Sequence, residues 1–219
     1  MKWGLFGGTF DPVHFGHLRA AQELAAILGL ERVIFLPAGE PPHKTSRDIT
    51  PFEHRLRMVR LAIAGNDRFD VSDLESRRRG KSYSVDTVRS FLAAPDSPPE
   101  LYFITGQDAF DAIATWRQWE DLLGLCHFAV MTRPGYENGG LHSILPADLA
   151  TRYVYDEKQD GFIAPSGRGI FFRRTTFLDI SASAIRESVR AGRSISYLTP
   201  DAVIAYIASK RLYGFSGNP

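Results

Sequence analysis

The sequence has little of three features that would place a protein in other classes. Cys126 is the only cysteine, so an internal disulfide is excluded and a reducing, cytoplasmic location is expected. Neither charge is in surplus, since 26 Lys and Arg face 25 Asp and Glu, which argues against a nucleic acid polymer as partner. Neither a run of about 18 apolar residues nor a signal peptide is present, so no membrane partner is expected.

The sequence has enough apolar residues to form a substantial core. It has 219 residues, of which 44% are hydrophobic and 12% aromatic, a length that fits a single domain. Strands are predicted at 3–6, 32–36, 69–72, 101–105, 127–132 and 170–172, and helices at 16–28, 84–92, 181–191 and 200–209. A further helix is predicted to begin at a capping box of Thr50 and Glu53, with Pro51 at its first position. The stretch 137–169 is expected to be rich in loops.

This alternation of strands and helices predicts the fold class α/β. We expect one Rossmann-like, doubly wound parallel sheet with helices on both faces and a C-terminal helical segment at about 180–213. Ligands of such sheets bind beyond the carboxyl ends of the strands, so the junctions between strands and helices are the candidate sites.

The first junction combines two glycines with two histidines. Gly7 and Gly8 allow a ligand to approach the main chain, and the following helix offers free N–H groups to an anion. His14 and His17 would point into the same junction and could donate hydrogen bonds to phosphate oxygens. Simple turn chemistry with structural histidines is one alternative, and a zinc site shared with His43 is another. The junction matches neither a Walker A loop nor the G-x-G-x-x-G fingerprint.

A second anion site is predicted near the C-terminus. Ser181 is a good N-cap for the helix that follows Ile180, and free N–H groups at that helix start can bind an anion. Arg186 lies one turn further and could reach the same anion through two hydrogen bonds. An ordinary capped amphipathic helix is the alternative.

Four other segments also follow strands. Residues 37–44 end in His43 and Lys44, and residues 82–87 read Ser-Tyr-Ser-Val-Asp-Thr. Asp108 follows Gly106 and suits a pair of ribose hydroxyls, and Trp116 offers an aromatic face for stacking. The fourth segment begins at Arg133.

Together these motifs resemble the nucleotidyltransferase superfamily with the H-x-G-H motif. Residues 8–17, Gly-Thr-Phe-Asp-Pro-Val-His-Phe-Gly-His, are similar to its extended signature in nicotinate-nucleotide adenylyltransferases, and residues 180–186 resemble its I-S-x-[ST]-x-I-R motif. Ala182 and Ser84 replace the commoner serine and threonine, and the stretch 137–169 has no matching motif.

The resemblance implies adenylyl transfer from ATP to nicotinate mononucleotide within a domain spanning 1–219, giving the dinucleotide and pyrophosphate in NAD biosynthesis. It implies that Mg²⁺ is carried with ATP and that the protein has no metal site of its own. It also allows a homo-oligomer. The implied catalytic residues are His14, His17, Lys44 and Arg186. The implied ATP-binding residues are Gly7, Gly8, Thr9, Phe10, His17, Gly106, Asp108, Ile180, Ser181, Ser183 and Arg186. The implied mononucleotide-binding residues are Phe10, His43, Lys44, Tyr83, Ser84, Trp116 and Arg133.

Several alternatives stay open at this point. Nicotinamide mononucleotide or another phosphate-bearing acceptor could be the preferred substrate, as in pantetheine-phosphate and glycerol-phosphate nucleotidyltransferases. A nucleotide-sensing module without catalysis and a zinc hydrolase belong to other classes.

Overall fold

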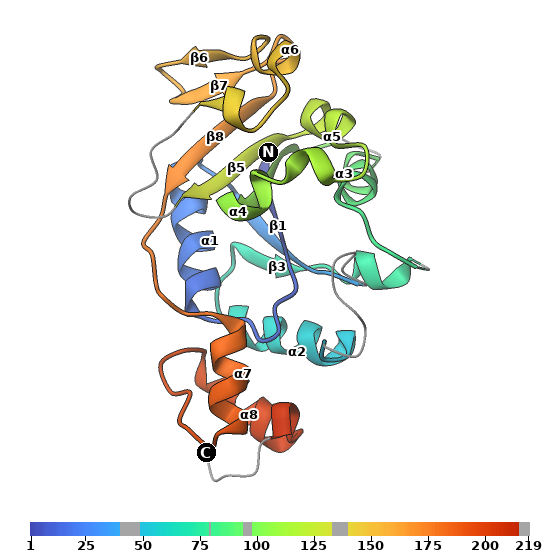
Figure 1. The fold of residues 1–219 in the computed structure, drawn as a ribbon. Helices are drawn as coiled ribbons and strands as arrows, with labels where there is room; N and C mark the ends of the chain where they lie inside the picture. Colours follow the sequence, from blue (N-terminus) through green and yellow to red (C-terminus); the bar gives the residue numbers. More distant parts are fainter. Residues whose placement is uncertain (40–48, 79, 94–97, 133–139, 215–219) are drawn as a thin grey trace.

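The computed structural model describes residues 1–39, 49–78, 80–93, 98–132 and 140–214. They form an eight-stranded sheet in the order β3-β2-β1-β4-β5-β8-β7-β6 (Figure 1). Its strands are β1 (Lys2–Gly8), β2 (Arg32–Pro37), β3 (Phe69–Val71), β4 (Glu100–Gly106), β5 (His127–Thr132), β6 (Val154–Asp156), β7 (Gly161–Ile163) and β8 (Gly169–Arg174). The first six in spatial order are parallel, whereas β7 and β6 pair antiparallel.

Helices cover both faces of this sheet. The α-helices are α1 (Phe15–Ile27), α2 (Phe52–Ile63), α3 (Ser84–Leu92), α4 (Gln107–Phe110), α5 (Trp119–Leu125), α6 (Ala147–Ala150), α7 (Ala182–Arg190) and α8 (Asp201–Ser209). Short 3₁₀ helices lie at η2 (Leu74–Arg77), η3 (Ile113–Thr115), η4 (Leu141–Ser143) and η5 (Leu212–Gly214).

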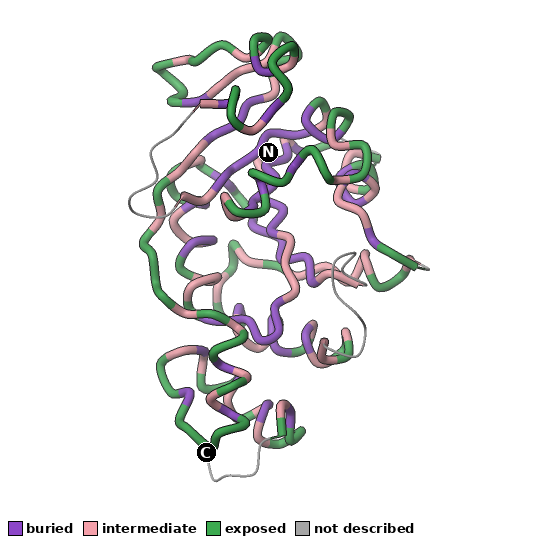
Figure 2. The backbone as a smooth tube through the Cα atoms, in the orientation of Figure 1, coloured by how far each residue is buried: buried purple, intermediate pink, exposed green. Residues whose placement is uncertain are grey.

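The core consists of two layers because side chains alternate along each buried strand. Phe6 of β1 belongs to the layer that contains buried residues of α1, α2, α7 and α8, while its neighbour Leu5 belongs to the layer that contains buried residues of α3, α4, α5 and α6. The buried segments follow the central strands, and exposure increases towards the two ends of the molecule (Figure 2). The predicted α/β, Rossmann-like fold with helices on both faces is confirmed.

The stretch predicted to be rich in loops, 137–169, also contains short elements that the prediction missed in the part that the structure describes. Its residues form η4, α6 and the hairpin β6–β7, which extends the sheet beyond β8. Each strand of the hairpin has only three residues, and Val154 and Tyr155 are exposed. Such short, exposed strands lack the long apolar run that identifies a buried strand in a sequence. The sheet is therefore mixed at this edge rather than wholly parallel.

The predicted capping box of α2 is wrong. Pro51 takes the N-cap position, and no side chain caps the helix. Thr50 lies one residue earlier, where its N–H donates to Asp11 Oδ2 at 3.1 Å and its carbonyl accepts from Arg55 Nε at 2.9 Å. Tertiary hydrogen bonds have replaced the local cap. Within the described chain, no helix has the length and apolar character needed to cross a bilayer.

Candidate active site

The carboxyl ends of β1 and β4 form the centre of the candidate site. The chain moves from β1 to β2 on one side and from β4 to β5 on the other, so the strand order reverses between these two neighbours. Open α/β sheets bind ligands at such a switch point. Gly7–Gly8 and Gly106 end the two strands there.

A large pocket of about 540 Å³ lies on one side of these strand ends. Its volume falls within the range of small-molecule sites. Six residues singled out in the sequence line it, from β1, the loop that follows it, the start of α3 and the end of η3: Gly7, Gly8, Thr9, Tyr83, Ser84 and Trp116. The Trp116 ring packs edge-on against Phe103, with ring centroids 5.8 Å apart, so an aromatic surface borders the pocket.

Two charged side chains line this pocket among the described residues, Glu75 and Arg117. Burial raises the pKa of the Glu75 carboxyl, which accepts hydrogen bonds from Thr87 Oγ1 at 3.0 Å and Gly39 N at 3.4 Å. The Arg117 guanidinium lies 4.7 Å from the centroid of the Tyr83 ring. The pocket thus combines an apolar surface with one cation and one held carboxyl.

A small pocket of about 190 Å³ lies on the other face of the same strand ends. His17, Gly106 and Asp108, all predicted site residues, line it together with Thr176. The Glu23 carboxylate holds the segment after β8 in place, accepting from the Thr176 N–H and hydroxyl at 2.6 Å each. Neighbouring residues of β1 and β4 therefore face different pockets. On β1, Phe6 lines the small pocket and Gly7 the large one; on β4, Gly106 lines the small pocket and Thr105 the large one.

The two histidines are in direct contact at the start of α1. Their rings stack with centroids 3.6 Å apart, and the His14 main-chain N–H donates to His17 Nδ1 at 3.2 Å. Burial lowers the pKa of His14 to about 4, and burial together with nearby His14 holds the pKa of His17 well below its usual value. Both rings are therefore neutral near pH 7.

The hydrogen bond fixes the tautomer of His17. Because Nδ1 accepts, the ring proton of neutral His17 must be on Nε2, which is then a donor. His14 is buried, and its Nδ1 has no partner among the described residues. A buried polar atom left in this way is an acceptor or donor available to a ligand.

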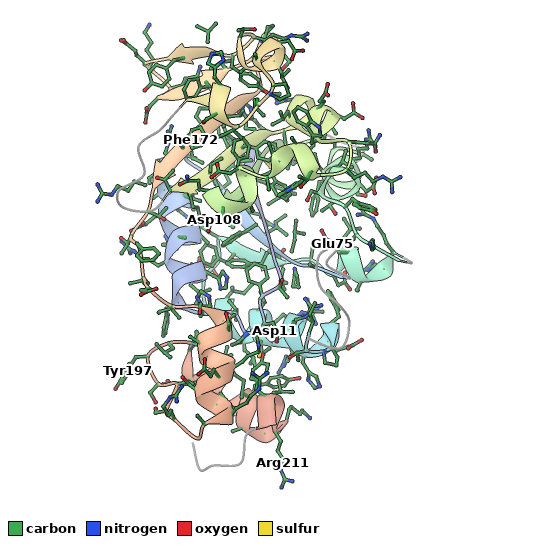
Figure 3. The ribbon with its side chains drawn as sticks, viewed as in Figure 1. Asp11, Glu75, Asp108, Phe172, Tyr197 and Arg211 are labelled. Atoms are coloured by element: carbon green, nitrogen blue, oxygen red, sulfur yellow. The ribbon has the colours of Figure 1, made fainter. Side chains whose placement is uncertain are left out.

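The C-terminal motif meets the first junction through Asp11. Arg186 of α7 donates from Nη1 to the Asp11 carbonyl at 2.7 Å, while Asp11 Oδ1 accepts from the Tyr213 hydroxyl at 2.7 Å. Ser181 is the N-cap of α7, as predicted, and its Oγ accepts from Ala184 N at 3.2 Å. In Figure 3, Asp11 is labelled close to α2, whereas Glu75 and Asp108 lie apart from it on other elements.

Comparison with known proteins assigns the chain to a family. A family model described as cytidylyltransferase-like matches residues 5–188. A probable nicotinate-nucleotide adenylyltransferase of Pelobacter propionicus is 44% identical over 97% of this chain and 98% of its own. A protein of the same name from Geobacter sulfurreducens is 43% identical over 99% and 100%.

The chain belongs to the nicotinate-nucleotide adenylyltransferase family. The nicotinic acid mononucleotide adenylyltransferase of Plasmodium falciparum, solved in complex with NaAD, shares its fold with a TM-score of 0.72. That structure is 19% identical and covers 98% of both chains. The same protein in complex with APC gives a TM-score of 0.71 at 18% identity, again over 98% of both chains.

The structure limits how some of the residues suggested by the family motifs can act. The Phe10 side chain is buried against Phe6, Phe35 and His17, so only its main chain remains to face a ligand. Ser183 is exposed on α7, and Ile180 is half-buried beside another groove, outside both pockets. Three further predicted residues, His43, Lys44 and Arg133, lie outside the described residues.

The zinc alternative finds no ligand set in the part of the chain that the structure describes. Among these residues no three His, Cys, Asp or Glu side chains gather in a way that could hold a metal ion. His43, which that alternative required, is not among them.

Four residues at the site were not predicted from the sequence: Asp11, Arg55, Glu75 and Arg117. Arg55 alone had a readable signal, because it lies four residues before Val59 on the buried stripe of α2. A charged residue at a core position of an amphipathic helix is exceptional. The roles of the other three depend on contacts between distant segments.

Proposed function

We propose that this protein transfers the adenylyl group of ATP to nicotinate mononucleotide, giving nicotinate adenine dinucleotide and pyrophosphate. This is a step of NAD biosynthesis, and the relatives at 43–44% identity bear the name of that activity. One structural observation supports it most: two pockets flank the carboxyl ends of β1 and β4, and the stacked histidine pair at the start of α1 contributes His17 to the small one. Such an arrangement suits two substrates that react with each other at the strand ends.

The large pocket is the proposed acceptor site. Its volume of about 540 Å³, the aromatic edge at Trp116 and the main-chain groups at Ser84 suit the pyridine end of a mononucleotide. ATP is assigned to the small pocket side, where Asp108 can bind ribose hydroxyls and Gly106 allows close approach. Arg186 and the N-terminus of α7 are suited to the triphosphate.

The reaction needs little acid–base chemistry from the protein. An oxygen of the mononucleotide phosphate attacks the α-phosphorus of ATP, a new P–O bond forms, and the bond to the β-phosphate breaks to release pyrophosphate. The attacking phosphate is already an anion near pH 7, since its second pKa is about 6. No general base is required, which agrees with two histidines whose lowered pKa values make them weak bases. Positioning and charge stabilisation supply the catalysis.

His17 is proposed as a donor to the α-phosphate. Its Nε2 carries the proton because Nδ1 accepts from the His14 main chain, so the ring can donate as negative charge develops on a phosphate oxygen. Lys44 and Arg186 are proposed to neutralise the leaving pyrophosphate.

Mg²⁺ enters this proposal as part of the ATP substrate. It would bridge triphosphate oxygens and keep water as most of its remaining ligands. The proposed partners are thus MgATP and the mononucleotide, and the proposed location is the cytoplasm.

The test is pyrophosphate release from MgATP with three acceptors: nicotinate mononucleotide, nicotinamide mononucleotide and phosphopantetheine. We expect turnover with nicotinate mononucleotide and a dinucleotide product of the corresponding mass. Turnover with phosphopantetheine alone would reject the proposal, as would a protein that binds ATP and mononucleotide without releasing pyrophosphate. Omission of Mg²⁺ in a parallel assay tests the metal.

A further inference from the structure

Arg55 of α2 is an arginine in the core, with 2% of its surface exposed. Its guanidinium donates three hydrogen bonds, all to main-chain carbonyls: Nε to Thr50 at 2.9 Å, Nη1 to Thr9 at 2.9 Å and Nη2 to Gly39 at 3.2 Å. Among the described residues, no carboxylate lies within ion-pair distance of it. The carbonyls belong to the loop after β1, the chain after β2 and the residues just before α2.

A charge at this position is costly, and stability alone does not explain it. Removing a guanidinium from water is unfavourable, and a well-packed apolar side chain of similar volume often stabilises a core at least as well. What an apolar side chain cannot do is bind three carbonyls in one fixed geometry. The planar guanidinium can, because its donors point in set directions.

The main chain of Gly39 is held on both sides of its Cα atom. Its carbonyl accepts from Arg55 Nη2, and its N–H donates to Glu75 Oε2 at 3.4 Å. A Cβ atom at residue 39 would lie 2.7 Å from the Glu75 carbonyl oxygen, so only glycine fits without a shift. We call Arg55, Gly39 and Glu75 the Gly39 clamp.

The clamp continues to α3 on the other side of the large pocket. Glu75 Oε1 accepts from Thr87 Oγ1 at 3.0 Å, and Thr87 Oγ1 accepts in turn from Arg78 Nη1 at 2.8 Å. Thr87 lies one turn after Ser84, which lines the pocket. A chain of hydrogen bonds thus runs from Thr9 through the clamp to the start of α3.

We propose that Arg55 is a positioning residue for the acceptor pocket, setting the separation of the Thr9 loop, the end of β2 and the start of α3 through the Gly39 clamp. The inference rests on the proposed function, because it assigns the large pocket to the mononucleotide. Thr9, Ala38, Glu75 and Ser84 lie on the segments that the clamp joins, and all four line the large pocket. None of them lines the small pocket, so we expect the clamp to affect the mononucleotide more than ATP, although the family motif also assigns Thr9 to ATP.

The test compares Arg55→Lys with wild type in steady-state kinetics, varying each substrate in turn. Lysine keeps the charge but cannot donate to three carbonyls at once, so the pocket walls lose their fixed separation. We expect KM for nicotinate mononucleotide to rise roughly tenfold, as for loss of hydrogen bonds to a charged group, while KM for ATP changes less than about twofold. Arg57→Lys is the matched control, an exposed arginine on the same helix, with both KM values unchanged.

A second variant changes the main chain at Gly39 without altering a buried charge. Gly39→Ala pushes the peptide away from Glu75, and we expect the same selective rise in KM for the mononucleotide. In the double variant with Arg55→Lys, KM for the mononucleotide should rise much less than the product of the two single effects, because both substitutions act through the main chain of Gly39. Gly39→Ala also decides the question if an Arg55 variant fails to fold.

Several outcomes would overturn the proposal. They are equal rises in KM for both substrates, a lower melting temperature with unchanged KM values, and fully multiplicative effects in the double variant. The first two would leave Arg55 with a structural role alone, and the third would show that Arg55 does not act through Gly39. The wild-type arm tests the proposed function separately, since it either releases pyrophosphate from these substrates or does not. If no pyrophosphate is released, quenching of tryptophan fluorescence measures the affinity of wild type and of each variant for the mononucleotide, because Trp116 lines the pocket.

Discussion

The main-chain N–H of His14 donates to the ring Nδ1 of His17, and the two rings stack 3.6 Å apart. This relationship places two uncharged imidazoles at the start of α1 and leaves the Nε2 proton of His17 as a donor. A cationic pair so close together would repel, which adds to burial in favouring the neutral forms. The pair is suited to hydrogen bonding with phosphate rather than to proton transfer.

Replacing His17 by alanine is expected to lower kcat at least about 10²-fold, because a donor to the developing charge is lost. Pyrophosphate release at saturating substrates measures the effect, and circular dichroism checks folding. His142→Ala, at an exposed histidine of η4, should leave kcat unchanged. A folded His17→Ala protein with near-normal turnover would remove His17 from the mechanism.

Replacing Arg117 by glutamine is expected to reduce the preference for nicotinate over nicotinamide mononucleotide. Arg117 is the one described cation lining the large pocket, and a substrate carboxylate would otherwise meet Glu75 as the only charged side chain described there. We expect the ratio of the two kcat/KM values to fall roughly tenfold, as for loss of a charge-assisted hydrogen bond.

Arg89→Gln is the matched control for that selectivity, since Arg89 is an exposed arginine of α3 paired with Asp121 at 2.9 Å. The ratio should not change in this variant. If wild type itself uses both mononucleotides equally well, the predicted preference for nicotinate mononucleotide is wrong. If Arg117→Gln lowers kcat/KM equally for both, the guanidinium binds the phosphate they share.

Stability is expected to fall in mild acid because of His127. This buried ring accepts from Gly169 N at Nδ1 (2.9 Å) and lies 3.1 Å from Glu100 at Nε2, and burial lowers its pKa to about 4. Glu100 opposes this shift, while Arg168 and Lys2 reinforce it.

The direction of this pH dependence follows because His127 is neutral in the folded protein. The unfolded chain binds a proton near pH 6.5 and the folded chain only near pH 4, so the stability is fully present above pH 6.5 and lost between pH 6.5 and 4. The shift of the His127 pKa from 6.5 to about 4 corresponds to a loss of about 3 kcal/mol at most. Urea unfolding at several pH values measures it. His127→Gln should flatten this part of the profile, leaving the part due to His14 and His17, and an unchanged slope would contradict the assignment.

Tyr213→Phe is expected to lower the free energy of unfolding by about 1–3 kcal/mol. The change leaves Asp11 Oδ1, a largely buried oxygen, without the 2.7 Å hydrogen bond from the tyrosine hydroxyl. Tyr155→Phe removes a comparable bond to Asp160 at 2.6 Å on the surface, where water can replace it. Denaturant unfolding should therefore separate the two variants, and equal effects would rule out a special role for Asp11.

The sequence predicted the central strands and most of the long helices because their signals are local. An apolar run such as 101–105 is buried wherever the sheet places it, and Ser181 caps its helix through a residue three positions away. The hairpin β6–β7 was not predicted because its strands are short and exposed. The capping box of α2 was predicted wrongly because Thr50 forms a hydrogen bond with Asp11 instead. In both cases contacts with distant segments decided the local structure.

The candidate site divides in the same way. The glycine turn, the histidine pair and the α7 motif could be predicted because each is a compact pattern at the end of an element. The division into two pockets could not, because it depends on which face of β1 and β4 each residue occupies. The opposite placement of Phe6 and Gly7 follows from strand alternation only once the register is known.

By itself the sequence determined the α/β fold class and the chemistry gathered at the end of the first strand. Only the tertiary structure decided that Arg55 would bind the carbonyls of Thr9, Gly39 and Thr50. The physical reason is that every residue has the same main-chain carbonyl, so no side-chain pattern marks the three acceptors. Their positions are fixed when the sheet brings distant loops together, and a buried guanidinium then has partners that a sequence cannot show.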